Sequence, residues 1–204
     1  MELASVSGEA SAVGQTTLTE TYLDFETYLA RTDKTDGRYE LVNGVLVDMP
    51  PESEENNDIA RMLLFELAKH FPAQLIGHKD TEIEVSGQRA TCRIPDLLVH
   101  TEASKAAVTA ASRATITRDM PPPALVVEVV SPGQANRDRD YRYKHTEYGA
   151  RGVAEYWIVD PEMQRVTVCL WVNGCFEDTV YTGTESIEST IAEKFALTSA
   201  EIFA

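Results

Sequence analysis

The sequence predicts an α/β domain in which helices flank a mixed, strongly bent β-sheet. Two Asn-Gly pairs, at residues 43–44 and 173–174, each stand between short strand-like runs, which is the pattern of tight hairpins. Apolar residues recur with helical spacing through residues 53–71, and the apolar run from Ala124 to Val130 is typical of a buried strand. The resulting order of helices and strands implies one mixed sheet with helical connections.

In the N-terminal half, a helix is expected over Thr21 to Thr32, followed by a hairpin over Arg38 to Met49. The hairpin register places Glu40 opposite Val47, and the pattern alone leaves open which hairpin face is buried. The clearest helix covers Ser53 to Phe71, because Ser53 is a possible N-cap and acidic residues fill the first turn.

Three strands are expected next, over Gln74–Gly77, Thr81–Ser86 and Thr91–Val99. The segment from Thr101 to Met120 is small, polar and mildly basic, and is expected to be a helical or mobile insertion. Three consecutive prolines end it, and the strand over 124–130 follows.

In the C-terminal half, the sequence predicts a helix over Arg137 to Gly149, then a sheet-forming region, and a short terminal helix over Thr198 to Phe203. In the hairpin around residues 173–174, Cys169 falls opposite Asp178, so Cys169 and Cys175 point to different faces and no disulfide is expected. The strands of this region are Ala154–Asp160, Arg165–Val172 and Cys175–Tyr181.

Length and composition fit one domain over residues 18–204, preceded by a disordered lead-in over 1–17 that is rich in small polar residues. No run approaches the roughly 18 apolar residues that a membrane helix requires, and the N-terminus lacks the pattern of a signal peptide. We therefore expect a soluble, cytoplasmic protein.

The formal charge is −15, from 18 basic and 33 acidic residues, which counts against non-specific binding to nucleic acid. The exception is the segment 137–151, which holds five basic and three acidic residues. This net-basic segment surrounds Lys144.

Two carboxylates occupy strands that are otherwise apolar: Asp96 in the strand over 91–99 and Glu128 in the strand over 124–130. Ionised carboxylates in such strands are costly unless they are paired, protonated or bound to a metal. With Glu40 as a candidate third ligand and Lys144 within reach on the next helix, the pattern predicts Mg²⁺- or Mn²⁺-assisted phosphodiester hydrolysis.

The arrangement resembles the PD-(D/E)XK nuclease superfamily, with Pro95-Asp96 as its PD and Glu128 as its second acid. Val130 stands where the superfamily lysine is expected, and some branches move that lysine to the following helix, where this chain has Lys144. The chain is also similar to the Uma-two family of restriction-endonuclease-like proteins over residues 18–204. The similarity rests, in order, on RYELVNGVLVDMPP, RIPDLLV, PPPALVVEVVSP, DYRYKHTEY and GVAEYWIVDPE.

The resemblance implies a restriction-endonuclease-like core, a DNA substrate and a homodimer. It also implies that Glu40, Asp96 and Glu128 bind Mg²⁺ or Mn²⁺ and that Lys144 is the catalytic lysine. Where many relatives carry a histidine, this chain has Asn56, which can bind a phosphate but cannot donate a proton as imidazolium does.

The sequence leaves the roles of the arginines near Lys144 open and gives the histidines no metal-binding pattern. The arginines of the basic segment either contact phosphate or form a solvated face, and the histidines show no metal-ligand spacing and are treated as structural or exposed. These residues are Arg137, Arg139 and Arg142, and His70, His78, His100 and His145. The alternative function is a non-catalytic regulatory or protein-interaction module on a nuclease-like scaffold, which the acidic charge favours and the buried acids oppose.

Overall fold

The computed structural model describes residues 22–30 and 38–204. The predicted lead-in over 1–17 lies outside the described residues, as do both ends of the first predicted helix. Its middle forms α1, Phe25–Ala30.

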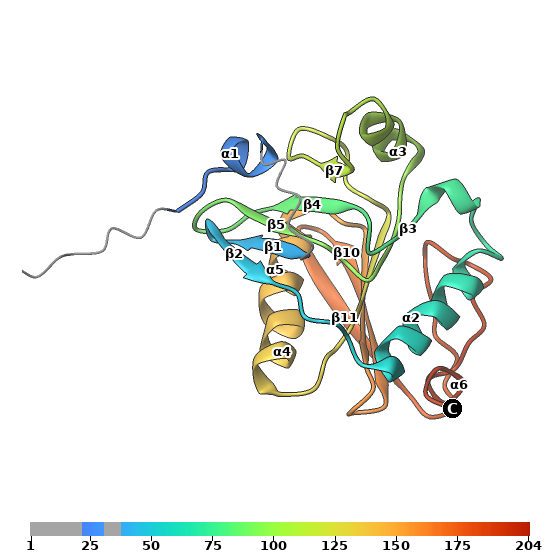
Figure 1. Cartoon of the computed structure of the whole chain (residues 1–204). Helices are drawn as coiled ribbons and strands as arrows, with labels where there is room; N and C mark the ends of the chain where they lie inside the picture. The colour runs from blue at the N-terminus through green and yellow to red at the C-terminus, as the bar shows by residue number, and fades with distance from the viewer. Residues whose placement is uncertain (1–21, 31–37) are drawn as a thin grey trace, which may run out of the picture.

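The strands form two sheets (Figure 1). The five-stranded sheet has the order β2-β1-β5-β4-β7, made of Val45–Asp48, Tyr39–Val42, Thr91–Arg93, Glu82–Val85 and Thr115–Ile116. The six-stranded sheet has the order β11-β10-β9-β8-β6-β3, made of Cys175–Thr182, Arg165–Val172, Glu155–Asp160, Leu125–Val129, Leu97–Val99 and Ile76–His78. Both are mixed, because β4/β7 and β8/β9 are parallel pairs among antiparallel ones. The predicted α/β class with helices flanking mixed β-structure is confirmed, although the strands that were expected in one bent sheet form two.

The predicted single strand over Thr91–Val99 is wrong, because the chain changes sheets in its middle. β5 ends at Arg93 in the five-stranded sheet, and β6 begins at Leu97 in the six-stranded sheet. Pro95 has no N–H to donate to a ladder, so strand pairing stops there. Asp96 consequently lies at the junction of the two sheets rather than inside a strand.

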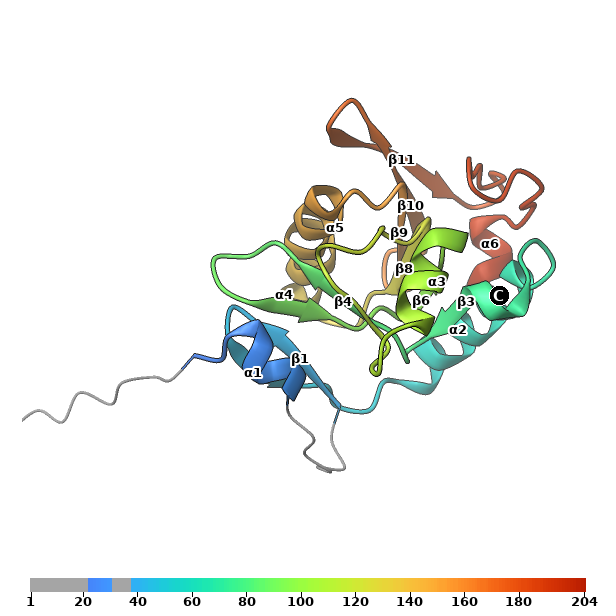
Figure 2. The ribbon, with the colours of Figure 1, turned by 90° about the horizontal axis from the view of Figure 1, so that it is seen from above.

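Helices cover both faces of the six-stranded sheet (Figure 1). α2, Glu54–Leu67, and α6, Ser199–Ile202, pack on one face, where Ser53 caps α2 as predicted. The opposite face packs against Tyr148 of the helix that follows β8 and against the inner side of β4. α1 packs on the outer side of the five-stranded sheet, over Leu41 and Cys92 (Figure 2).

The helix predicted over Arg137–Gly149 is longer and contains a wide turn. It comprises α4 (Gln134–Asp138), a π-helical segment (Arg139–Lys144) and α5 (His145–Arg151), and ends at Gly152 with a φ of 82°. π-Helical turns within α-helices occur frequently at functional sites. Here both buried residues of the π-helical segment are charged: Asp140 and Lys144.

The predicted insertion at 101–120 contains a helix, which agrees with its helical alternative. It contains α3, Glu102–Thr109, capped by Thr101, and then β7, which pairs in parallel with β4. The strand expected over 74–77 is shifted, because a 3₁₀ turn, Ala73–Leu75, precedes β3.

Both hairpin registers are confirmed, with Glu40 opposite Val47 and Cys169 opposite Asp178. Glu40 and Leu41, which point to opposite hairpin faces, are both buried. Within the part of the chain that the structure describes, no helix has the length and apolar character needed to cross a bilayer.

Candidate metal-dependent active site

Side chains alternate along β8, and this alternation places Glu128 on the face of the six-stranded sheet that packs against α5. Leu125, Val127 and Val129 face α2, so Glu128 faces Tyr148 and Lys144 on the other side. Its Oε1 accepts a hydrogen bond from the Tyr148 hydroxyl at 2.7 Å, and its Oε2 lies 2.8 Å from Lys144 Nζ. Burial, together with Asp140 and Glu40 nearby, raises the pKa of Glu128 to about 7 despite the opposing effect of Lys144.

Asp96 is tied directly to the strand that carries Glu128. Its Oδ2 accepts a hydrogen bond from the backbone N–H of Val129 at 2.7 Å, and its Oδ1 lies 3.5 Å from Lys79 Nζ. Burial is the main cause that raises the pKa of Asp96 well above its usual range, and the nearby carboxylates of Glu128 and Glu52 add to it. The two predicted metal ligands therefore lie next to each other, and negative charge on them is costly without a further cation.

Glu40 comes from the other sheet and is held by Arg93 on the neighbouring strand β5. Its Oε2 accepts a hydrogen bond from Arg93 Nη1 at 2.9 Å, and its Oε1 accepts one from the Ile94 N–H at 3.1 Å. Arg93 uses its other two nitrogens for Glu147 of α5, at 2.8 and 2.9 Å. This fork–fork pairing fixes the five-stranded sheet against the helix that carries Lys144.

Lys144 is 2 % exposed and lies among three carboxylates. Its Nζ is 2.8 Å from Glu128, 3.5 Å from Asp140 and 3.7 Å from Glu40. These carboxylates raise the pKa of Lys144 against the effect of burial, so it stays protonated. All four predicted catalytic residues thus lie around one cavity of about 570 Å³, which Glu40, Asp96, Glu128 and Lys144 all line.

Asn56 lies at the first turn of α2, fully enclosed, and is turned toward the end of β8. Its Nδ2 donates to the carbonyl oxygens of Val129 and Val130, both at 3.4 Å. The side chain therefore holds the strand end beside Glu128, and its predicted contact with phosphate stays a prediction.

The three arginines predicted to contact phosphate are in different surroundings. Arg137 pairs with Asp160 and Glu162, while Arg139 pairs with the buried Asp140 and lines the cavity. Arg142 is the most exposed of the three and pairs only loosely with Asp138, at 3.7 Å. Of the three, only Arg139 lines the cavity, and their predicted contacts with phosphate stay predictions.

Among the residues of the site that were not predicted are Glu52, Lys79, Arg93 and Tyr148. Lys79 Nζ contacts both Glu52 and Asn57 and approaches Asp96, although Lys79 precedes Asp96 by 17 positions in the sequence. Of these, only Arg93 had a recognisable signal, since an arginine in a predicted buried strand requires a partner as much as a carboxylate does.

The charges of the described site suit a divalent cation. The ion pairs of the site form two sets. In one, Lys79 pairs with Glu52 and Asp96. In the other, three cationic side chains pair with four carboxylates: Arg93, Arg139 and Lys144 with Glu40, Glu128, Asp140 and Glu147. Each set has one carboxylate more than it has cations. The first set contains Asp96 and the second contains Glu128, and the pKa values of both are raised. Carboxylate oxygens are the donors that Mg²⁺ and Mn²⁺ prefer, so the residues present fit such an ion.

Two mixed sheets with helices on both sides, meeting at a cavity lined with acids and a lysine, define a restriction-endonuclease-like nuclease fold. The chain belongs to the Uma2 family, described as "putative restriction endonuclease", whose family model matches residues 20–200. This confirms the resemblance inferred from the sequence segments.

One solved structure similar to this chain is the 1.96 Å crystal structure of a "putative nuclease belonging to DUF820" from Anabaena variabilis ATCC 29413. The two share a TM-score of 0.66 at 14 % sequence identity, and the match covers 89 % of this chain and 97 % of the other. At that identity the likeness shows a common fold. No curated protein matches the chain.

Proposed function

We propose that this protein is a Mg²⁺- or Mn²⁺-dependent endonuclease that hydrolyses phosphodiester bonds of DNA. The observation that carries the proposal is the convergence of Glu40, Asp96, Glu128 and Lys144, all buried, on one cavity. A scaffold with no chemistry to perform gains little from such a group, because buried ion pairs stabilise a fold no better than well-packed apolar residues. Family membership supports the nuclease activity, and the donor set supports the metal.

Asp96 and Glu128 would hold the ion, with Glu40 as the third carboxylate. Such an ion lowers the pKa of a water molecule and offsets negative charge on the phosphoryl group when it is bound. The Val129 N–H and the Tyr148 hydroxyl, each bonded to one of the two ligands, orient the carboxylates so that lone pairs stay directed at the cavity.

Lys144 would act on the attacking water and on charge that develops at the phosphate. Its ammonium group is held by carboxylates on three different elements, so little reorganisation is needed when the substrate arrives. As a protonated group it donates hydrogen bonds and orients the water, and it does not remove a proton itself.

The substrate would enter past the exposed side of the basic helix. Tyr143 is 56 % exposed, lines the cavity and has the Arg142 guanidinium 5.9 Å from its ring centre. An aromatic ring and a cation beside the cavity suit a nucleic-acid strand, whereas the rest of the chain is acidic. A homodimer, as the family resemblance implies, would supply the two cavities that simultaneous cleavage of both strands requires.

Plasmid relaxation by the purified protein tests the proposal. We expect nicked circles with Mg²⁺ or Mn²⁺ and none with excess chelator, and Mn²⁺ should also give a calorimetric binding signal without DNA. A pure interaction module would show neither the signal nor the nicking, and nicking that continued in chelator would contradict the metal-dependent mechanism.

The affinity for Mn²⁺ should rise steeply with pH from 6 to 8. The pKa of Glu128, which faces Lys144, Asp140, Glu40 and Tyr148, is raised to about 7, and that of Asp96, beside Lys79 and Glu52, is also raised. The ion must therefore displace protons, and each proton displaced makes the dissociation constant about tenfold smaller per pH unit as long as the pH is below the pKa of the group that loses it. Calorimetry in buffers of different ionisation enthalpy would count these protons, and a pH-independent affinity would contradict the assignment.

A further inference from the structure

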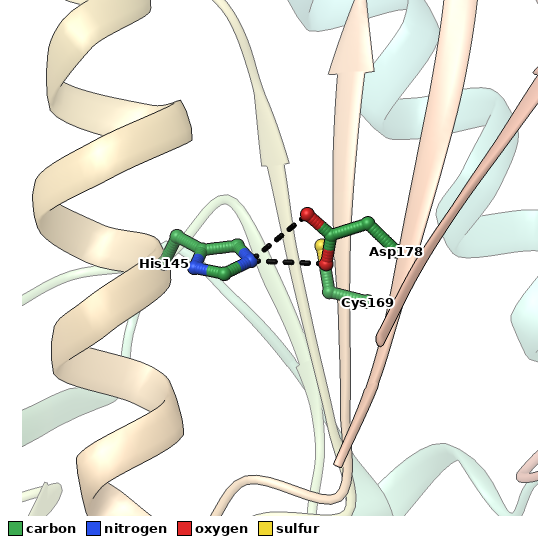
Figure 3. A group of neighbouring side chains, drawn as sticks. All are labelled: His145, Cys169 and Asp178. Carbon is green, nitrogen blue, oxygen red and sulfur yellow. Dashed lines mark hydrogen bonds and ion pairs between the residues drawn. The ribbon is translucent and has the colours of Figure 1, made fainter. Parts of the chain in front are cut away.

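A second group of potential metal ligands lies on the hairpin side of α5 (Figure 3). His145 comes from α5, Cys169 from β10 and Asp178 from β11, and one ligand atom of each lies within 4.8 Å of the other two. Tetrahedral bonds to Zn²⁺ of about 2.0–2.3 Å separate ligand atoms by about 3.3–3.8 Å. Small movements of the side chains would therefore bring all three onto one ion.

The sequence builds this group through two separate features. The hairpin register places Cys169 directly opposite Asp178. One turn after His145 on the same helix face, Gly149 lets the hairpin approach, because a Cβ there would lie 3.0 Å from the Trp171 ring. The helix consequently lies near enough for His145 Nε2 to contact both carboxylate oxygens of Asp178, at 3.0 and 3.1 Å.

The surroundings suit an ion that is partly dehydrated. Cys169 is fully buried, and the ring of His145 packs edge-on against Phe176, with ring centres 5.1 Å apart. The side chains of His145 and Asp178 are 24 % and 44 % exposed, which gives an ion a path to the group and leaves room for a water as a fourth ligand. One thiolate and one carboxylate would neutralise a divalent cation.

We propose that His145, Cys169 and Asp178 form a binding site for a Zn²⁺-class transition-metal ion, separate from the nuclease site. A nitrogen, sulfur and oxygen donor set selects borderline ions such as Zn²⁺ or Co²⁺ over Mg²⁺, which binds sulfur poorly. The Cys169 thiol loses its proton to solvent as the metal–sulfur bond forms. The bound ion ties β11, the edge strand of the large sheet, to the helix residue that follows Lys144.

Titration of the full chain with Co²⁺, in the presence of excess Mg²⁺, tests this site. We expect a thiolate-to-cobalt charge-transfer band in the near ultraviolet that Zn²⁺ abolishes by displacement. Cys169→Ser should lose the band, whereas Cys175→Ser should keep it, because Cys175 is exposed at the end of the same hairpin. Asp96→Asn should also keep the band, which separates this site from the nuclease site.

His145→Gln is the second test, and it decides the matter if the buried Cys169→Ser change prevents folding. The His145 side chain is partly exposed, so the variant should fold and lose the band together with the Zn²⁺-dependent rise in melting temperature. No band in the unchanged protein, an undiminished band in His145→Gln, or loss of the band in Cys175→Ser would each overturn the proposal.

Discussion

Asp96→Asn should greatly slow metal-dependent nicking while leaving the metal-free protein as stable as before, or more so. Burial and nearby carboxylates disfavour the charged form of Asp96, as its raised pKa shows. A neutral amide of the same shape removes that cost, and its oxygen can still accept the hydrogen bond from the Val129 N–H. A divalent ion contributes several kcal/mol of transition-state stabilisation, so its loss should lower the nicking rate by about 10²- to 10³-fold.

With metal present, the unchanged protein should gain stability and Asp96→Asn should not. In the unchanged protein the pKa of Asp96 is higher in the folded than in the unfolded state, so its contribution to stability falls as pH rises toward that folded-state pKa. Mn²⁺ should restore this loss at pH 8, and it should restore nothing in Asp96→Asn. Glu177→Gln, an exposed carboxylate change on β11, is the control and should leave both responses unchanged. Nicking at the normal rate in Asp96→Asn would remove Asp96 from the site.

Asp96 and Glu128 could be predicted because each breaks a local rule of composition, whereas Glu40 and Lys144 became candidates through their order along the chain and the family resemblance. Glu128 interrupts an apolar strand, and Asp96 follows a proline in another. A buried charge is expensive wherever it lies, so its cost is visible in sequence without knowledge of the fold. The structure brings the four together around one cavity, and their roles stay predictions until tested.

The charges that surround the site could not be predicted in the same way. Glu52 and Lys79 lie in polar segments, where a charged residue is ordinary and gives no signal. They lie beside Asp96 because the chain crosses from β5 in one sheet to β6 in the other at Pro95. The sequence does not predict this crossing, because residues 91–99 have the pattern of a single strand.

The group of His145, Cys169 and Asp178 could not be predicted from the sequence for the same reason, because only the tertiary fold brings its members together. Its members show no ligand spacing in sequence because they come from a helix and two strands, and only Cys169 opposite Asp178 followed from the hairpin register. The contact with His145 depends on how closely α5 packs on the hairpin, which is a property of tertiary structure.

Lys144→Met should separate catalysis from metal binding. Methionine fills a similar volume without charge, so the nicking rate should fall by about 10²- to 10³-fold, the cost of losing one preorganised stabilising group. Mn²⁺ should still bind, and more tightly than before, because Glu128 loses the competing cation 2.8 Å away. Single-turnover nicking and Mn²⁺ calorimetry on the same preparation measure the two effects.

The metal-free Lys144→Met protein should also be less stable by about 3–5 kcal/mol, because the buried carboxylates of Glu40, Glu128 and Asp140 lose their shared cation. Mn²⁺ supplies positive charge at the same place, so it should raise the melting temperature of this variant more than that of the unchanged protein. Lys69→Met, at an exposed lysine after α2, is the matched control and should change neither stability nor nicking appreciably. Normal nicking by Lys144→Met would show that Lys144 does not replace the superfamily lysine that is missing at Val130. Weakened Mn²⁺ binding would show that Lys144 positions the carboxylates rather than acting on the substrate.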